Sequence, residues 1–324
     1  MNQRCKQIAA HGVIILVSLT IISCAKGTSK NTGKAAVDRA IGNALSWVYT
    51  HPAHFAEYSP EIPFSPFVEI SEEIITFYIL HRDAQEPSLK NSYTREIQKR
   101  LELIASKDDF TPQPPDFTML LAIASISEKM GLHIIDFRTI IEQRLLSSPL
   151  LYPPHVTTSI WNTVYLERMG FNPRRGLDEI MSKSTLVREV QQRLLYQHVK
   201  GQFDPMYIDP VSITTYDITH EIFSLTDFGE LPPPPIIIEN QAFYAELFDS
   251  IIQWSITAKH IDILAEVIMC AKILHLKGVP SVNQGIQFII DQQKKDGSFG
   301  VTNPGRPNVF RHGILVSIMA LALP

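Results

Sequence analysis

The chain has 324 residues, of which 45% are hydrophobic and 19% are charged, and its formal net charge is -4. This composition excludes a disordered polyelectrolyte, and the lack of a basic excess excludes a dedicated nucleic-acid-binding protein. Three cysteines are too few for a disulfide scaffold, while the length allows either two domains or a single large helical domain.

The N-terminal segment differs from the rest of the chain, because Arg4 and Lys6 precede an apolar run at residues 13–22. A membrane-spanning helix needs about 20 apolar residues, so this run has the length of a signal-peptide core. It ends in Ile21-Ile22-Ser23-Cys24, which resembles the bacterial lipobox. The resemblance implies that residues 1–23 are removed and that Cys24 carries a lipid as the mature N-terminus. An ordinary signal peptide and an uncleaved N-terminal anchor are the alternatives.

Residues 25–34 are small, polar and basic, so residues 24–34 are expected to form a lipidated cysteine and a flexible tether. The expected domains are therefore a signal peptide at 1–23, the tether at 24–34 and one helical domain at 35–324. The lipobox resemblance implies a lipid-anchored protein of the bacterial cell envelope, with the membrane as its partner. Ala25, in place of aspartate, implies the outer membrane, facing the periplasm or the surface, if the cell is Gram-negative.

Helical periodicity extends over most of the remaining chain, and no segment shows the alternation of strands in a hairpin. Glycine and proline stops divide this body into about twelve helices. Pro232-Pro233-Pro234-Pro235 predicts an extended connector. The expected ranges are 35–50, 67–83, 89–106, 115–130, 135–147, 154–169, 184–198, 213–225, 240–257, 260–277, 282–295 and 308–322.

One motif near the C-terminus indicates how the helices are arranged. Gly285-x2-Phe288-x3-Gln292-x4-Gly297-x-Phe299 resembles the QW motif of the terpenoid-cyclase and prenyltransferase superfamily, with Phe299 in place of tryptophan. Asp296-Gly297 predicts a tight turn after a helix, from which Phe299 folds back onto the helix end. The resemblance implies an all-α fold, an α/α toroid of stacked helix pairs, in which the motif is structural.

The catalytic motifs of that superfamily are missing. There is no Asp-x-Asp-Asp or Asp-Asp-x-x-Asp sequence, and Asp262 stands eight residues before Cys270, so the Asp-x-Cys zinc pair is absent. We therefore exclude terpene cyclisation and prenyl transfer and expect no metal or cofactor. A zinc ion between Cys270 and His312 is a minor alternative.

A second resemblance covers nearly the whole body. It is carried by Ala44-Leu45-Ser46-Trp47, by residues 216–229 with Thr-His-x-x-Phe-x-x-Thr-Asp-Phe-Gly, by Trp254 with residues 262–266, and by Phe310-Arg311-His312. Together these segments resemble an uncharacterised bacterial family of helical domains, a domain of unknown function. The resemblance implies a fold and candidate positions but no activity.

The densest polar segment on an apolar helix supplies the first candidate site. Tyr216 and His220 are four residues apart, Asp217 and His220 are three apart, and Asp227 is seven residues beyond His220. These residues share a face if the helix continues that far. A carboxylate beside an imidazole orients it as a general base, so His220 and Asp227 are candidate base and orienter. The alternative is a structural pair at a helix end.

Other candidates depend on the arrangement of the helices. His312 begins the last helix, where it could meet His220 or could serve as a cap. Trp47 and Trp254, with Trp161, could line a binding cavity or pack in the core. The acidic pairs Glu72-Glu73 and Asp108-Asp109 do not predict a glycosidase, because adjacent helix residues point apart.

The preferred functional hypothesis is a tethered, non-catalytic binding or envelope-associated domain. The alternative is a hydrolase or lyase acting on carbohydrate or peptide through His220 and Asp227. The third hypothesis is a purely structural role within an envelope complex. The hydrolase or lyase hypothesis would be favoured if the side chains of His220, Asp227 and His312 lay within reach of one another.

Overall fold

The computed structural model describes residues 31–53, 65–107, 116–147, 155–173, 175–201, 208–299 and 307–324. The signal peptide, Cys24, the tether up to residue 30 and the pair Asp108-Asp109 lie outside these described residues. Within them the chain consists of helices joined by turns and loops, and the one β-type pairing is an isolated bridge between Gln293 and Phe299. The predicted all-α class is confirmed.

The helices of the described residues follow one another as α2 (Asn31–Thr50), α3 (Pro66–Asp83), α4 (Pro87–Ala105), α5 (Phe117–Met130), α6 (Phe137–Ser147), α7 (Val156–Arg168), α8 (Leu177–Met181), α9 (Thr185–Gln192), α10 (Leu194–Lys200), α11 (Ile208–Thr226), α12 (Pro235–Glu239), α13 (Gln241–Ala258), α14 (Ile261–Ile273), α15 (Val282–Asp291) and α16 (Pro307–Ala322). Every predicted range overlaps one of them.

The differences from the prediction have local causes. The range 184–198 covers α9 and most of α10 instead of one helix, because Arg193 adopts a left-handed backbone with φ 55° and ends α9. The short helices α8 and α12 span five residues each, too few for a periodic pattern. Helix α2 begins at Asn31, so residues 31–34, expected in the tether, extend the helix that Ala35 and Ala36 favour.

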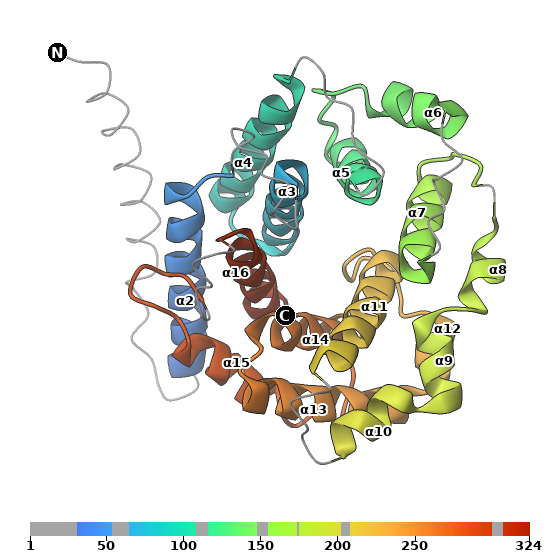
Figure 1. Ribbon diagram of the computed structural model, residues 1–324. Coiled ribbons are helices and arrows are strands. Elements are labelled where there is room, and N and C mark those ends of the chain that lie inside the picture. The colour runs from blue at the N-terminus through green and yellow to red at the C-terminus, as the bar shows by residue number, and fades with distance from the viewer. Residues whose placement is uncertain are drawn as a thin grey trace.

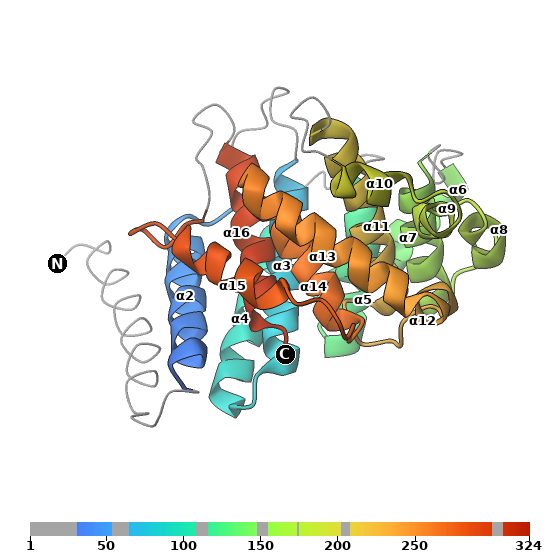
Figure 2. The ribbon, with the colours of Figure 1, turned by 90° about the horizontal axis from the view of Figure 1, so that it is seen from below.

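Six helices contact one another in a closed cycle, in the order α3, α5, α7, α11, α14 and α16, with α16 returning to α3. Figure 1 shows them around a common centre. The other helices lie outside this cycle: α4 packs on α3, α6 on α5, α8 on α7, α13 on α14, and α2 on α16. The first described helix therefore lies beside the last one, and Figure 2 shows the same neighbours after a quarter turn.

The segment after α15 joins that outer layer to α2. The predicted turn is present, since Gly297 has φ 94° and the Lys294 N–H donates to the Ser298 carbonyl at 2.8 Å. Phe299 is buried, as expected. The glutamine that reaches α2 is Gln293, and not Gln292 of the QW-like motif: its Nε2 donates to the Ala40 carbonyl at 2.8 Å. This turn links two segments about 250 residues apart in the sequence.

The core is apolar, but several ionisable residues are buried on the six central helices. They include Glu69 and Glu73 on α3, Glu221 on α11 and Glu266 on α14. Burying a charge is costly unless it is paired, so these side chains require partners from neighbouring helices. Among the helices that the structure describes, none is both long and apolar enough to span a bilayer.

Candidate functional site

Four adjacent helices of the central cycle supply one group of polar side chains around His312. We call it the His312 cluster, and its members are Glu72 from α3, Tyr216, Thr219 and His220 from α11, Asp262 and Glu266 from α14, and His312 from α16. Residues three or four apart on a helix share a face, which places the α11 members side by side and the two α14 acids one turn apart.

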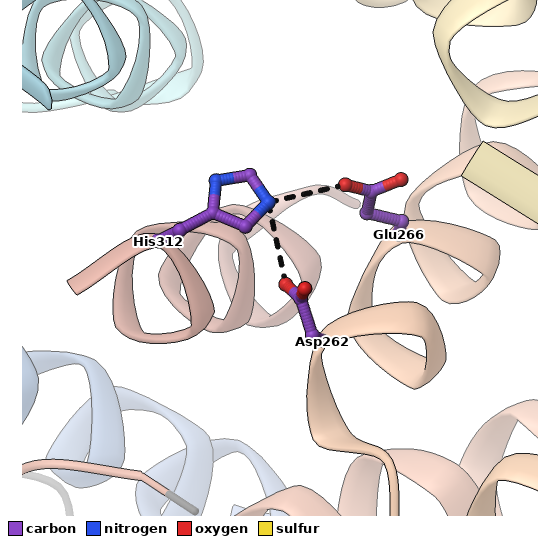
Figure 3. A group of neighbouring side chains, drawn as sticks. All are labelled: Asp262, Glu266 and His312. Carbon is purple, nitrogen blue, oxygen red and sulfur yellow. Dashed lines mark ion pairs between the residues drawn. The ribbon is translucent and has the colours of Figure 1, made fainter. Parts of the chain in front are cut away.

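The imidazole of His312 lies between carboxylates on both sides. Its Nε2 is 3.3 Å from Asp262 Oδ1 and 3.4 Å from Glu266 Oε1, as Figure 3 shows. Its Nδ1 is 2.9 Å from Glu72 Oε1. Burial lowers the pKa of His312, but the charges of Glu72 and Asp262 outweigh it and place that pKa well above its usual range. The acids around the ring therefore favour a positive charge at this position.

Hydroxyl groups hold the second oxygen of each α14 carboxylate. The Tyr216 hydroxyl donates to Asp262 Oδ2, and the Thr219 hydroxyl donates to Glu266 Oε2. Burial and the charge of Asp262 raise the pKa of Tyr216, so it remains a proton donor. The other oxygens, Asp262 Oδ1 and Glu266 Oε1, accept no hydrogen bond from the residues that the structure describes. These are the two atoms that face His312.

The two α14 acids differ in pKa because their surroundings differ. Burial raises the pKa of Asp262, against the opposing charge of His312. Burial also acts on Glu266, but His220 and His312 together outweigh it and lower the pKa of that carboxyl. Glu266 is thus held as a carboxylate although its side chain is only 1% exposed.

His220 forms the solvent-facing edge of the His312 cluster. Its Nε2 lies 3.8 Å from Glu266 Oε1, and 36% of its side chain is exposed. Aromatic rings surround it, with Tyr216 stacked at 6.0 Å and Trp161 tilted at 5.9 Å. His220 and His312 therefore meet through Glu266, and the imidazole of His220 is accessible to solvent.

Asp227 is not the partner of His220, contrary to the proposed base-and-orienter pair. Helix α11 ends at Thr226, and Asp227 follows in a left-handed conformation with φ 51°, so the shared helical face does not extend to it. Its carboxylate binds Lys129 and lies 3.4 Å from Arg168 Nη1. The carboxylate beside His220 is that of Glu266, and the hydrolase or lyase hypothesis loses the pair on which it rested.

The other predicted binding residues lie outside the His312 cluster. Asp217 accepts a hydrogen bond from Thr157 at 3.1 Å and lies 3.3 Å from His155 Nε2. Trp47 stacks on His51 at 4.4 Å, and Trp254 packs near His260 at 6.2 Å.

Both tryptophans are only 8% exposed, so each contributes to the core. Cys270 is buried, and its thiol donates to the Thr219 carbonyl at 3.9 Å. The thiol is thus engaged with the α11 backbone, and the nitrogens of His312 face carboxylates, so the sulfur–imidazole zinc pair is not formed.

Three acids of the cluster were not among the predicted site residues: Glu72, Asp262 and Glu266. Asp262 and Glu266 carry a usable signal, because two acids four residues apart on an otherwise apolar helix point in one direction. Glu72 was set aside with Glu73 as an adjacent pair, and the structure confirms that they point apart: Glu72 contacts His312, while Glu73 contacts Arg311.

A buried ion network lies behind the His312 cluster. Arg311 Nη1 is 2.5 Å from Glu73 Oε1, and Arg311 Nε is 3.5 Å from Glu69 Oε2. Arg100 binds the second oxygen of Glu73 at 2.5 Å and Glu96 at 2.8 Å. These two arginines pair with the three acids of the network, whereas the carboxyl groups of the cluster face His312 and His220.

Glu221 follows His220 on α11 but lies outside the His312 cluster and binds the start of α9. Its two oxygens accept hydrogen bonds from the Thr185 and Leu186 N–H groups at 2.8 and 3.0 Å, which fixes the start of α9. Burial raises the pKa of Glu221 from 4.5 to about 7, although those N–H groups lower it. Since the folded state holds the proton more tightly than the unfolded state, this residue's contribution to stability falls as pH rises from 4.5 to about 7.

Glu221→Gln should therefore change the pH profile of stability. Glutamine does not titrate, so the stability of the wild type relative to the variant should fall by up to about 3 kcal/mol over that interval. Urea unfolding of both proteins at half-unit pH steps measures the difference. Parallel profiles for the two proteins would contradict the assignment of this titration to Glu221.

Fold and site together define an all-helical domain with a buried histidine–carboxylate cluster shared by four helices. The chain belongs to the family described as "Domain of unknown function (DUF6895)", whose sequence model matches residues 41–308. The resemblance to a domain of unknown function is thereby confirmed, and the matched range contains every member of the His312 cluster except His312 itself. No curated protein and no solved structure matches the chain.

Proposed function

We propose that this chain is a lipoprotein of the bacterial cell envelope, held at the membrane through Cys24, whose helical domain binds a cationic ligand without converting it. The observation that carries the binding function is the convergence of three carboxyl groups, from Glu72, Asp262 and Glu266, on the imidazole ring of His312. Carboxyl groups outnumber the basic side chains of the His312 cluster, and low dielectric strengthens their attraction for a cation. The side chain of His220 is 36% exposed, so this residue marks the side on which the cluster meets solvent.

We further propose that the domain is an α/α toroid. The closed cycle of six contacting helices and the outer helices packed on them support this arrangement. The turn at Gly297, which joins α15 to α2, supports it as well, because the resembling motif ties helices together in toroidal proteins. In such a fold one central region can collect side chains from many helices, as the His312 cluster does from four.

The lipid anchor is tested by Cys24→Ser. A thioether-linked lipid requires the cysteine sulfur, so the variant should lose the lipid mass and move from the membrane to the soluble fraction. Mass spectrometry of the mature N-terminus and membrane fractionation measure the two effects. Cys5→Ser is the matched control, because Cys5 lies within the segment expected to be removed. Unchanged processing and membrane retention in Cys24→Ser would contradict the lipoprotein assignment.

The binding function is tested with a panel of cations and the purified full-length chain. A ligand at 100 times its Kd raises the free energy of unfolding by about 2.7 kcal/mol, which a thermal or urea unfolding curve detects. The panel contains Zn²⁺, Mn²⁺, Ca²⁺ and the organic cation spermidine. We expect saturable stabilisation that Glu266→Gln abolishes and Glu128→Gln retains, because Glu128 is an exposed acid paired with Arg138. Stabilisation by no cation would contradict the binding function.

A further inference from the structure

We propose that the ligand of the His312 cluster is a divalent transition-metal ion bound by Asp262 Oδ1, Glu266 Oε1 and His312 Nε2, with the ion displacing the proton from that nitrogen and with His220 beside the site. The inference rests on the proposed binding function and names the ligand. The three principal donor atoms lie within 4.8 Å of one another and come from two neighbouring helices.

The spacing of these atoms fits a small cation. Zinc binds imidazole nitrogen and carboxylate oxygen at about 2.0–2.1 Å in a tetrahedral arrangement, which implies about 3.3 Å between donor atoms. His312 Nε2 is 3.3 Å from Asp262 Oδ1 and 3.4 Å from Glu266 Oε1. His220 Nε2 is 3.8 Å from Glu266 Oε1, so its ring lies beside the three donors.

Among the described residues, the two donor oxygens pair only with the histidines of the cluster. Glu266 is buried, with 1% of its side chain exposed, and its Oε1 accepts no hydrogen bond from the described residues. Asp262 Oδ1 is likewise inaccessible and accepts none. A buried carboxylate oxygen that accepts no hydrogen bond is costly, and both of these point at the same nitrogen of His312 (Figure 3). A cation bound at this point satisfies both oxygens at once.

The groups behind the donors are arranged as they are around metal ions in proteins. A metal-binding histidine commonly donates its other N–H to a carboxylate, and metal-binding carboxylates are themselves hydrogen-bonded. Here Glu72 lies 2.9 Å from His312 Nδ1, which directs Nε2 toward the two acids. Tyr216 and Thr219 bind the outer oxygens Asp262 Oδ2 and Glu266 Oε2, which leaves Oδ1 and Oε1 for the ion.

The donor types select the class of metal. A mixed set of imidazole nitrogen and carboxylate oxygen suits Zn²⁺, Mn²⁺ or Fe²⁺, whereas Ca²⁺ takes six to eight oxygen ligands and Cu⁺ prefers sulfur. Cys270 is one turn further along α14, but its thiol is bound to the Thr219 carbonyl. The donors are therefore nitrogen and oxygen alone, and the exposed edge at His220 gives the ion its access.

The test uses the purified full-length chain after treatment with a chelator. Titration calorimetry with Zn²⁺ and with Mn²⁺, together with elemental analysis, measures affinity and stoichiometry. We expect one ion per chain. Tyr216→Phe removes only the hydroxyl behind Asp262 and should weaken binding roughly 10–100-fold, and Glu266→Gln, Asp262→Asn and His312→Gln should each weaken it further. Glu128→Gln should bind as the wild type does.

Four outcomes would overturn the assignment, and the first two separate it from the binding function. Stabilisation by spermidine but not by Zn²⁺ or Mn²⁺, lost in Glu266→Gln, would refute the metal and leave the binding function. Stabilisation by no cation would refute both. Zinc binding that survives Glu266→Gln and His312→Gln would place the ion elsewhere. If those variants do not fold, Tyr216→Phe decides the matter, because it keeps the aromatic ring in place and an unchanged affinity would refute the site.

Discussion

Gly297→Ala should destabilise the domain by about 3–5 kcal/mol, whereas Gly278→Ala should cost only about 1–2 kcal/mol. Both glycines have left-handed backbones, with φ 94° and 90°, so alanine meets similar backbone strain at each. They differ in their surroundings. A Cβ at Gly297 would lie 2.2 Å from the Asn43 carbonyl oxygen, while one at Gly278 would meet nothing within 4 Å. The atom in the way belongs to the α2 backbone, which yields only if α2 moves away from the turn.

Urea unfolding of the full-length chain measures both losses, and hydrogen exchange locates the effect. In Gly297→Ala, exchange should accelerate in α2 and α15, because Gln293 would lose its bond to the Ala40 carbonyl as the two segments separate. In Gly278→Ala it should not. Equal losses in the two variants would show that backbone strain alone accounts for the effect and that the turn does not join α2 to the rest of the domain.

The helices could be predicted from the sequence because their patterns are strong and their ends are marked. Helix α14 has an apolar face followed by Gly278 and Pro280, and its expected range of 260–277 contains the observed Ile261–Ile273. Helices α8 and α12 were missed because five residues make little more than one turn. The order of contacts among the central helices was beyond reach, since periodicity shows which face of a helix is buried and not which helix covers it.

The candidate site was predicted in part, and its failures have physical causes. His220 and His312 were identified, and both contact Glu266. Asp227 was expected on the same helical face as His220, but α11 ends at Thr226. Asp227 and Phe228 then adopt left-handed conformations, which the sequence pattern does not predict. Asp262 and Glu266 become part of a site because His312 on α16, about 50 residues further along the chain, lies beside them. The sequence alone does not show that contact.

Arg311→Met should cost about 3–5 kcal/mol of stability, because it removes the cation between two buried acids. Arg311 binds Glu73 at 2.5 Å and lies 3.5 Å from Glu69. Burial already raises the pKa of Glu69 to about 7, and Arg311 opposes this shift. Without the guanidinium the folded-state pKa of Glu69 rises further. The loss relative to the wild type should therefore be smallest near pH 5, where the carboxyl is protonated, and should grow as pH rises through 7.

The control is Arg138→Met, the same substitution at an arginine whose side chain is 55% exposed and pairs with Glu128 at 3.0 Å. An exposed pair contributes about 0–1 kcal/mol, and its loss should vary little with pH over this interval. Adding Glu69→Gln to Arg311→Met should recover part of the stability above pH 7, because the second change removes the charge that the first leaves unpaired. A loss for Arg311→Met no larger than that for Arg138→Met, or no recovery in the double variant, would mean that the acids of α3 do not depend on Arg311. In that case the ion network would not hold α16 and His312 in place against α3.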